Sequence, residues 1–345
     1  MKHSMKLATL AVACTFPAFA QAQSNVTIYG LLDVNLASER AGGLKRNAMD
    51  VSELNGSRLG FRGSEDLGNG LKAIFTLETG IATDVGGFGG DAFQRQTFLG
   101  LEGSFGRVTL GRQYSPAFVA LDPFEATGSS DRSAGMLHRK TGSVARGYQV
   151  RFNNMIKYRS PDMAGFSVDA GYWTGAENVS TDSDVRRAGR GYGLTGMYKN
   201  GPFSGAITTQ SYLSNDTGGR ATTHGIAGAY DLGVAKLYAL YSQDREHGSQ
   251  GSGKARSYSV GAEIPVSSVG TVAVSYGNRN ESGEANTEDA SGASIYYMHN
   301  LSKRTTLYTA YSQINNRGDA NYGFNITPEA GDNIRVVMAG VRHKF

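Results

Sequence analysis

The chain has 345 residues, and its 34 lysines and arginines against 30 acidic residues give a formal net charge of +4. So small a surplus gives no support to nucleic-acid binding. Hydrophobic residues make up 39% of the chain, which is thin for a conventional soluble core, while 47 glycines, 18 tyrosines and 15 phenylalanines favour strands and tight turns over helices.

The N-terminus has the pattern of a secretory signal peptide, with two lysines before an apolar run over residues 7–19 and small residues after it. We place the cut after Ala22, so that residues 1–22 are removed and residues 23–345 form one domain. The single cysteine, Cys14, lies in the removed segment, and the exported chain therefore has no disulfide and no cysteine metal site. Loss of the two lysines lowers the net charge to +2.

Beyond the signal, no apolar run reaches the roughly 18 residues of a transmembrane helix, so the chain can cross a membrane only with strands. Strand patterns with a period of two recur. In "LKAIFTLET" (71–79) apolar residues alternate with Lys72, Thr76 and Glu78, and "TVAVSYG" (271–277) alternates in the same way. Each window holds roughly 9–11 residues, enough to cross the hydrocarbon layer at a tilt.

The connectors between these windows alternate between short and long. The short ones are residues 66–70, 103–106, 160–165, 199–202, 231–233, 265–270 and 301–304. Long polar ones fall near residues 37–55, 80–92, 115–148, 175–190, 213–222, 243–255, 278–290 and 314–332. This organisation predicts an all-β fold, a 16-stranded antiparallel transmembrane barrel with short turns on one side and long loops on the other.

The two ends of the chain are expected to meet. In "NIRVVMAGVRHKF" (333–345) one face holds an outward row that ends at the C-terminal Phe345. This row would face lipid if the last strand closes against the strand that starts at Val26, which would place Phe345 at a membrane interface. The row comprises Val337, Ala339, Val341, His343 and Phe345.

Charged residues occupy one face of another strand. In "SRLGFRGSEDLG" (57–68), Arg58 and Arg62 share a face, and Leu59 and Phe61 share the other. In a soluble half-buried sheet the cationic face would meet bulk water, so this strand alone does not distinguish the two settings.

Five segments together carry a family resemblance. In chain order, they resemble the general trimeric porins of Gram-negative outer membranes, most closely the beta-proteobacterial subgroup. The segments are "SNVTIYGLLDVNL" (24–36), "SRLGFRGSEDLGNGLKAIFTLE" (57–78), "GSFGRVTLGRQYSP" (103–116), "NNMIKYRSPDMAGFSV" (153–168) and "GVRHKF" (340–345).

The resemblance implies a 16-stranded barrel in a homotrimer, with a third loop, about residues 114–149, folded inward to narrow the pore. It further implies outer-membrane lipid and lipopolysaccharide as surroundings, small hydrophilic solutes and ions as passengers, and no cofactor. Such a protein is a passive diffusion channel and no enzyme.

The resemblance also implies a row of wall arginines at the narrowest point, which matching motifs identify as Arg58, Arg95 and Arg151. These arginines would point into a water-filled lumen, because a charge facing lipid at the midplane costs about 2–4 kcal/mol. Alternation supports Arg58, opposite Leu59 and Phe61. It also supports Arg151, which it places on one face with Asn153, Lys157 and Arg159. The alternative is that they are ordinary lumen or rim arginines, and Lys157 is a further candidate for the constriction.

The acidic side of the pore is less well defined by the sequence. The glutamate-containing loop motif of enterobacterial porins is absent, and "LDPFEATGSSD" (121–131) stands in its place. Asp122, Glu125 and Asp131 are therefore candidates, against the default of exposed loop carboxylates. A lysine of some enterobacterial pores is replaced by Leu31, and Arg112 could line the subunit interface instead of the pore.

Three functions remain to be compared. The leading one is a channel that prefers anions weakly to moderately, because the three arginines, with Lys157 nearby, outnumber Asp122 and Glu125. The alternatives are an outer-membrane barrel enzyme of phospholipase or protease type, which would need a nucleophile and base that no motif marks, and an adhesin. The five histidines of the mature chain lack metal-ligand spacing, which indicates solvated surface positions and no metal site.

Overall fold

The computed structural model describes residues 25–127, 133, 137, 148–175, 188–213, 219–248, 251–283 and 288–345. The signal peptide predicted for residues 1–22 lies outside these residues, as does Asp131. Within the described part of the chain, no helix is both long and apolar enough to span a membrane.

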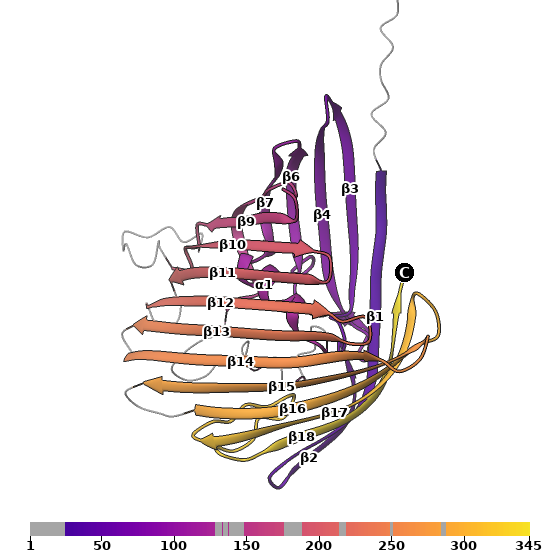
Figure 1. Ribbon diagram of the computed structural model, residues 1–345, viewed down its shortest axis with the longest axis vertical. Helices are drawn as coiled ribbons and strands as arrows, with labels where there is room; N and C mark the ends of the chain where they lie inside the picture. Colours follow the sequence, from indigo (N-terminus) through magenta and orange to yellow (C-terminus); the bar gives the residue numbers. More distant parts are fainter. Residues whose placement is uncertain are drawn as a thin grey trace, which may run out of the picture.

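The described strands form one antiparallel sheet that curls until its first and last strands meet (Figure 1). Pairing of β1 with β18, for example Asn35 with Gly340, closes the barrel. The strands are β1 (Asn25–Ala41), β2 (Leu44–Val51), β3 (Arg58–Gly68), β4 (Leu71–Ala82), β5 (Gly87–Phe88), β6 (Gln96–Gly103), β7 (Gly106–Tyr114), β8 (Arg151–Arg159), β9 (Phe166–Trp173), β10 (Gly191–Asn200), β11 (Phe203–Leu213), β12 (Arg220–Asp231), β13 (Lys236–Gly248), β14 (Gly251–Pro265), β15 (Gly270–Gly283), β16 (Glu288–Asn300), β17 (Thr305–Gly318) and β18 (Ile334–Lys344).

The wall has sixteen spanning strands, because β2 and β3 are two parts of one strand and β5 is a short hairpin partner of β4. β3 pairs with the first half of β1 and β2 with its second half. Between them, residues 52–57 leave the wall: Leu54 is buried, its backbone N–H donates to Asp33, and Glu53 accepts from Tyr296. The predicted number of strands is confirmed.

All seven short turns lie where the sequence places them, but three of the long connectors were drawn too long. β1 and β2 occupy most of residues 37–55, β13 and β14 most of 243–255, and β15 and β16 most of 278–290. Polar residues on both faces suggested loops there, but ladder hydrogen bonds extend the strands: β1 pairs with β2, β13 with β14, and the end of β15 with β14.

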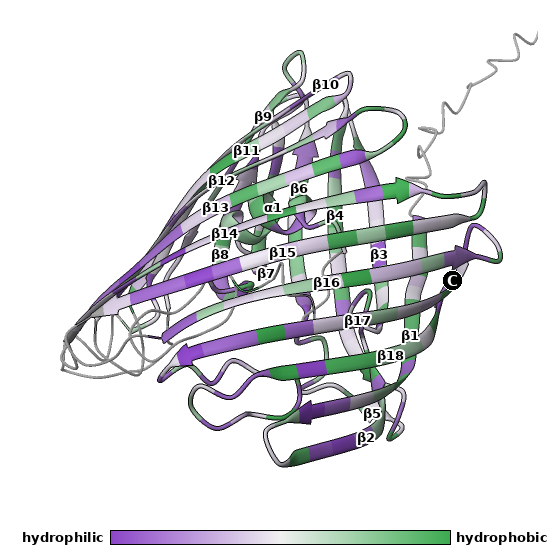
Figure 2. Ribbon diagram, turned by 60° about the horizontal axis from the view of Figure 1, so that its bottom comes forward, coloured by the Kyte–Doolittle hydropathy of each residue, from purple (hydrophilic) through white to green (hydrophobic). Residues whose placement is uncertain are grey.

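Hydrophobic and hydrophilic residues succeed one another along the strands (Figure 2), and the exposed fractions assign the apolar side chains to the outer face and the polar ones to the inner face. On β1, Ile28 is 62% exposed and Leu36 is 64% exposed, whereas the intervening Asp33 and Asn35 are buried. On β18, the predicted outward residues Val337, Ala339, Val341 and His343 are exposed, whereas Val336 and Met338 are buried and Gly340 and Arg342 are half-buried. The outer row therefore suits lipid contact, and the polar face suits water.

The C-terminal residue completes the closure. The backbone N–H of Phe345 donates to the carbonyl of Gly30 over 3.0 Å, and the N–H of Gly30 donates to the carbonyl of Phe345 over 3.1 Å. A Cβ at Gly30 would lie 2.4 Å from the Phe345 ring, so glycine is required for this close approach. The predicted pairing of the two chain ends is confirmed.

A short helix, α1 (Pro116–Leu121), follows β7 and is continued by the 3₁₀ helix η1 (Asp122–Phe124). The Ser115 side chain caps α1 by accepting from the N–H of Phe118. The helix packs on β10–β12, where Thr195 donates to the Pro116 carbonyl over 2.9 Å. A Cβ at Gly225 would lie 2.8 Å from Leu121, so this glycine makes room for the helix.

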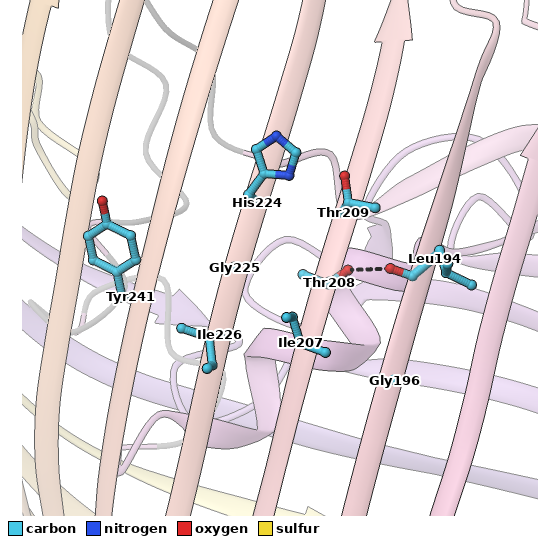
Figure 3. A pocket seen from close by; sticks show the side chains of 9 residues that line it. All are labelled: Leu194, Gly196, Ile207, Thr208, Thr209, His224, Gly225, Ile226 and Tyr241. Atoms are coloured by element: carbon cyan, nitrogen blue, oxygen red, sulfur yellow. Dashed lines mark hydrogen bonds between the residues drawn. The ribbon is translucent and has the colours of Figure 1, made fainter.

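The opposite, outer face of the same strands carries an apolar depression of about 490 Å³ (Figure 3). Exposed side chains of β10–β13 form its walls, and Gly196 leaves room beside Ile207. Figure 3 shows α1 behind these strands. The wall is therefore one sheet thick here, between the helix and the outer surface. The lining side chains include Leu194, Ile207, Ile226 and Tyr241.

A buried ionic network braces the wall near the last loop. Arg279 on β15 pairs with Asp244 of β13 over 3.2 Å and with Glu281 over 2.6 Å. Tyr322 of the loop after β17 donates to Glu281 over 2.9 Å. Because buried charges are costly without partners, this network ties the loop to the strands.

Candidate pore constriction

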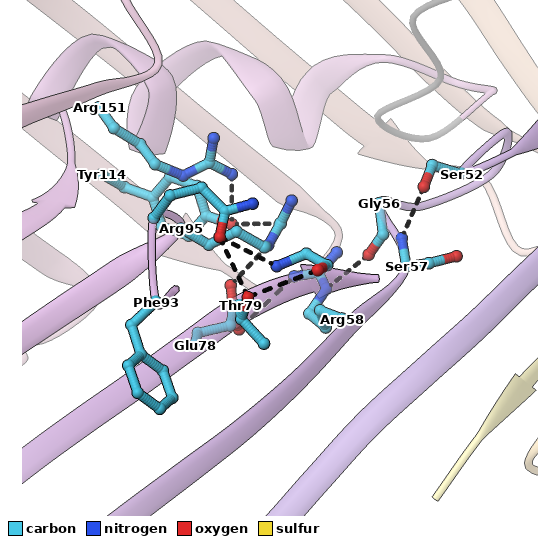
Figure 4. Close-up of polar contacts among 12 residues, drawn as sticks. Ser52, Gly56, Ser57, Arg58, Glu78, Thr79, Phe93, Arg95, Tyr114 and Arg151 are labelled. Carbon is cyan, nitrogen blue, oxygen red and sulfur yellow. Dashed lines mark hydrogen bonds and ion pairs between the residues drawn. The ribbon is translucent and has the colours of Figure 1, made fainter. Parts of the chain in front are cut away.

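A single buried carboxylate joins two of the three predicted arginines (Figure 4). Glu78 on β4 is 2% exposed, and its Oε1 accepts from Nε of Arg95 over 2.8 Å. Arg58 on β3 approaches the other oxygen at 4.0 Å. Tyr29 on β1 donates to the same oxygen over 3.0 Å. Glu78 thus binds two arginines from different segments: Arg58 at the start of β3 and Arg95 just before β6.

Backbone pairing explains why these side chains meet. Glu78 lies opposite Gly60 in the β3–β4 ladder, and Gly60 lies opposite Tyr29 in the β1–β3 ladder. Gly60 has no side chain, so Tyr29 can lie across its position: a Cβ there would be 2.4 Å from the tyrosine ring. The N–H of Arg95 donates to the Glu78 carbonyl over 3.1 Å, which fixes Arg95 beside the carboxylate.

The predicted alternation in β3 is confirmed. Arg58 shares a face with Arg62, whose guanidinium carbon lies 5.2 Å from the centre of the Tyr29 ring. Both arginines therefore lie on the face that carries Tyr29 and Glu78, the polar inner face of the barrel.

The phenol of Tyr114, at the end of β7, joins the remaining arginine. Its hydroxyl oxygen accepts from Arg95 over 2.8 Å and from Arg151 over 3.2 Å. The guanidinium carbon of Arg151 lies 4.6 Å from the Tyr114 ring centre, within cation–π range. The Tyr114 ring also stacks on the ring of Phe118 in α1, with 4.5 Å between the ring centres. Tyr114 therefore contacts both the helix and the two arginines.

The break between β2 and β3 contributes a backbone acceptor to this group. Nε of Arg58 donates to the Gly56 carbonyl over 2.8 Å. A Cβ at Gly56 would lie 2.7 Å from a guanidinium nitrogen of Arg95. A larger residue would therefore displace Arg95, and Gly56 belongs to the support of the cluster.

The alternation that linked Arg151 to Lys157 in the prediction does not hold along β8. β8 contains a bulge: Gly111 lies opposite Met155 and Gln113 opposite Phe152, so β8 holds one residue more than β7 over this stretch. Asn154, with a φ of 52°, lies in this bulge. The extra residue shifts the alternation, so strict alternation does not place Arg151 on one face with Lys157.

Lys157 has different partners from the three arginines. Its ammonium group lies 3.2 Å from Asp169 on β9 and donates to the Tyr114 carbonyl over 3.0 Å. The charge of Lys157 is therefore compensated by Asp169, and its bond to the Tyr114 carbonyl holds the end of β7.

The two acidic candidates of the loop are buried. Glu125 is 4% exposed and accepts hydrogen bonds from Thr127 and Ser133, and Asp122 lies in η1, which packs on β12 and β13. Burial raises the pKa of Glu125 to about 7. The carboxylate bonded to Arg95 is instead Glu78, which alternation had placed on the polar face of its strand.

Arg112 lies outside this cluster. Its Nε donates to the Gln94 carbonyl, and its Nη1 donates to Asn153 over 2.5 Å.

In the described ranges, no group of three or more His, Cys, Asp or Glu side chains could hold a metal ion.

The arrangement carries excess positive charge. Two of the three guanidinium groups bond one carboxylate and the third bonds Tyr114, so the described residues Arg58, Glu78, Arg95 and Arg151 together carry a net charge of +2. Fixed cations beside water attract anions over about one Debye length, about 10 Å at 0.1 M salt. The geometry suits the binding and passage of anions, and it offers no nucleophile activated by a base.

Comparison with known proteins agrees with this geometry. The model of a family described as Gram-negative porin matches residues 8–319. The chain is 35% identical to outer membrane porin protein 32 of Delftia acidovorans, over 94% of this chain and 95% of that protein. It is 30% identical to an outer membrane porin protein of Bordetella pertussis, over the full length of both.

Solved structures give the same result for the fold. A structure described as an anion-selective porin from Comamonas acidovorans superposes with a TM-score of 0.83 at 32% identity, covering 94% of this chain and all of that one. An OmpF structure from Salmonella typhi has a TM-score of 0.67 at 17% identity and shows the shared fold alone. The barrel is thus a channel of the outer membrane without enzymatic activity, and the chain belongs to the family of Gram-negative porins.

Proposed function

We propose that this porin is a passive diffusion channel for small hydrophilic solutes and ions that prefers anions. The observation that carries the proposal is the charge imbalance among the described residues of the cluster: Arg58 and Arg95 share Glu78, while Arg151 is held by the uncharged Tyr114. The description of the similar structure from Comamonas acidovorans as anion-selective supports the same preference.

We also propose that the segment from 115 to 149 folds into the lumen and narrows it. Contacts of α1 with β10–β12, the hydrogen bond from Thr195 to Pro116 and a 3.0 Å contact between Ser133 and Ser275 support this placement. Stacking of Tyr114 on Phe118 would then hold the loop against the arginines. Membership of the porin family supports assembly as a homotrimer, which should run as a heat-modifiable band in electrophoresis.

The role of the three arginines can be tested with the variant Arg58→Ser, Arg95→Ser, Arg151→Ser. Reversal potentials in a tenfold KCl gradient give the ratio of anion to cation permeability. Since the variant loses three positive charges and keeps Glu78, we expect the ratio to fall below one.

A matched control, called the turn control, removes three exposed positive charges at or beside short turns: Lys199 at the end of β10, and Lys303 and Arg304 between β16 and β17. This turn control should keep the ratio of the wild type. If the arginine variant kept the wild-type ratio as well, the selectivity would lie elsewhere in the pore.

A further inference from the structure

Residues 52–57, which separate β2 from β3, fold over the inner face of the barrel, and we call them the wall insert. The Leu54 side chain is buried in a cluster of inward-facing side chains from β1 and β15–β18. This cluster includes Tyr296 on β16 and Tyr308 on β17, and Tyr296 also donates to Glu53 over 2.8 Å. The wall insert therefore takes up space inside the barrel, next to the arginine cluster.

Asp33 on β1 binds the wall insert at both ends and in its middle. Its Oδ2 accepts from the N–H of Leu54 over 2.7 Å and from the N–H of Asn55 over 3.1 Å. Its backbone carbonyl accepts from the N–H of Ser52 over 2.9 Å. The Ser57 hydroxyl donates to the same carbonyl over 3.1 Å and accepts from the N–H of Asp33 over 2.9 Å.

The two oxygens of this carboxylate serve different parts of the barrel. Whereas Oδ2 binds the wall insert, Oδ1 accepts from the hydroxyl of Tyr308 over 2.6 Å. The Asp33 side chain is fully buried, so its loss would leave the N–H groups of Leu54 and Asn55 without this acceptor. The wall insert is therefore held in place by one side of a single carboxylate.

The wall insert in turn supports the arginines of the constriction (Figure 4). Arg58 follows it directly, and Nε of Arg58 donates to the Gly56 carbonyl over 2.8 Å. Because a Cβ at Gly56 would lie 2.7 Å from a guanidinium nitrogen of Arg95, the insert also contacts the second arginine. A displacement of the insert would thus change the direction of Arg58 and the width of the lumen beside it.

We propose that Asp33 is a positioning residue of the channel. Its carboxylate holds the wall insert against the inner face, and the insert both narrows the lumen and directs Arg58 toward the path of anions. Asp33 acts through the insert and not on a passing ion, because its own side chain is buried. The part that concerns Arg58 rests on the anion preference proposed above, whereas the narrowing of the lumen does not.

The test compares Asp33→Ala with the conservative variant Asp33→Asn. Both remove the negative charge, but asparagine keeps an oxygen that can accept from Leu54 and Asn55, and alanine does not. Single-channel conductance and the reversal potential in a tenfold KCl gradient, with 0.1 M as the higher concentration, are measured for each variant and for wild type. Since only assembled barrels conduct, a loss of stability alone leaves both readouts unchanged.

We expect Asp33→Ala to have a higher conductance than Asp33→Asn and a ratio of anion to cation permeability about twofold lower. A twofold change corresponds to a single charge that moves from about 5 Å to about 10 Å from the ion path at 0.1 M salt. Asp33→Asn should have the conductance of wild type. In an Arg58→Ser background the difference in permeability ratio should shrink, while the difference in conductance should remain.

Tyr308→Phe is the matched control, because it removes the donor to Oδ1 and leaves the bonds from Oδ2 to the wall insert. Its conductance and permeability ratio should equal those of wild type. The same changes in Tyr308→Phe as in Asp33→Ala would overturn the proposal, since any disturbance of the carboxylate would then suffice.

Equal conductance and equal permeability ratio in the two Asp33 variants would also overturn the proposal. A wild-type protein that prefers cations would refute the proposed anion preference, and equal conductance of the two variants would then still refute the role of Asp33. Should Asp33→Ala fail to assemble, Ser57→Ala, which removes the hydroxyl link to the Asp33 backbone, must raise the conductance and lower the permeability ratio relative to wild type.

Discussion

The charge balance at the arginine cluster predicts the effect of Glu78→Gln. Glutamine keeps the shape of the side chain and an oxygen that can accept from Arg95 and Tyr29, but it removes the negative charge. The cluster then has three guanidinium charges without a bonded carboxylate. We therefore expect the Glu78→Gln variant to prefer anions more strongly than the wild type and to form a less stable barrel.

The magnitude follows from Coulomb's law. An anion that passes about 5 Å from the lost charge in a water-like medium escapes a repulsion of about 0.8 kcal/mol before screening. A Debye length of about 10 Å at 0.1 M salt reduces this to about 0.5 kcal/mol, roughly a twofold gain in anion preference. At 1 M the Debye length is about 3 Å and the gain falls to about 1.3-fold.

The assay is the reversal potential in tenfold KCl gradients around these two concentrations. Glu102→Gln serves as the control, because Glu102 forms an ion pair with Arg107 near the β6–β7 turn and away from the cluster. Its permeability ratio should equal that of wild type. An unchanged or lower anion preference in Glu78→Gln at low salt would refute the proposed role of this carboxylate. Loss of the charged hydrogen bond should also lower the free energy of unfolding by about 1–3 kcal/mol.

Three further predictions concern the loop and the chain end. Burial raises the pKa of Glu125 from 4.5 to about 7, so the folded protein keeps a proton that the unfolded chain loses, and stability should fall as the pH rises through this window. Melting temperatures from pH 4 to pH 8 should show this fall in wild type and not in Glu125→Gln; parallel curves would contradict it. Deletion of Phe345 should cut assembled outer-membrane protein severalfold because the hydrogen bonds to Gly30 are lost, whereas Phe345→Leu keeps those backbone bonds and should assemble better; equal yields of all three proteins would contradict this. Shortening the segment between 115 and 149 should raise single-channel conductance, and an unchanged conductance would place that segment outside the lumen.

Much of the barrel could be predicted because the alternation of side chains along a strand depends only on residues close together in the sequence. A strand that separates lipid from water must alternate, so the outward row of β18 and the polar face of β3 were visible in the sequence. Short turns rich in glycine were equally visible. The pairing of β1 with β18 followed, because an open edge in a membrane would leave backbone groups without partners.

The details of the site depend on contacts that alternation does not encode. The bulge at Asn154 interrupts the alternation between Arg151 and Lys157, and nothing in the residues of β8 marks the extra position. The hydroxyl of Tyr114 meets Arg95 and Arg151 because the chain bends at the end of β7. Glu78 was predictable as an inward carboxylate, but its bond to Arg95 depends on a segment between strands.

The hairpins show a second limit of sequence reasoning. Near residues 243–255 both faces of the strands lie outside the apolar band, so polar residues at every position are compatible with a continuing ladder. Composition alone does not distinguish such a hairpin from a loop. The long loops were therefore overestimated where strands extend beyond the membrane.

The central claim is that excess positive charge at the arginine cluster makes this porin select anions. The most direct test is the reversal potential of the wild-type protein in a tenfold KCl gradient, with 0.1 M as the higher concentration. The potential should have the sign of anion preference and should shrink when both concentrations are raised tenfold, as screening increases. A potential with the sign of cation preference at low salt would contradict the account.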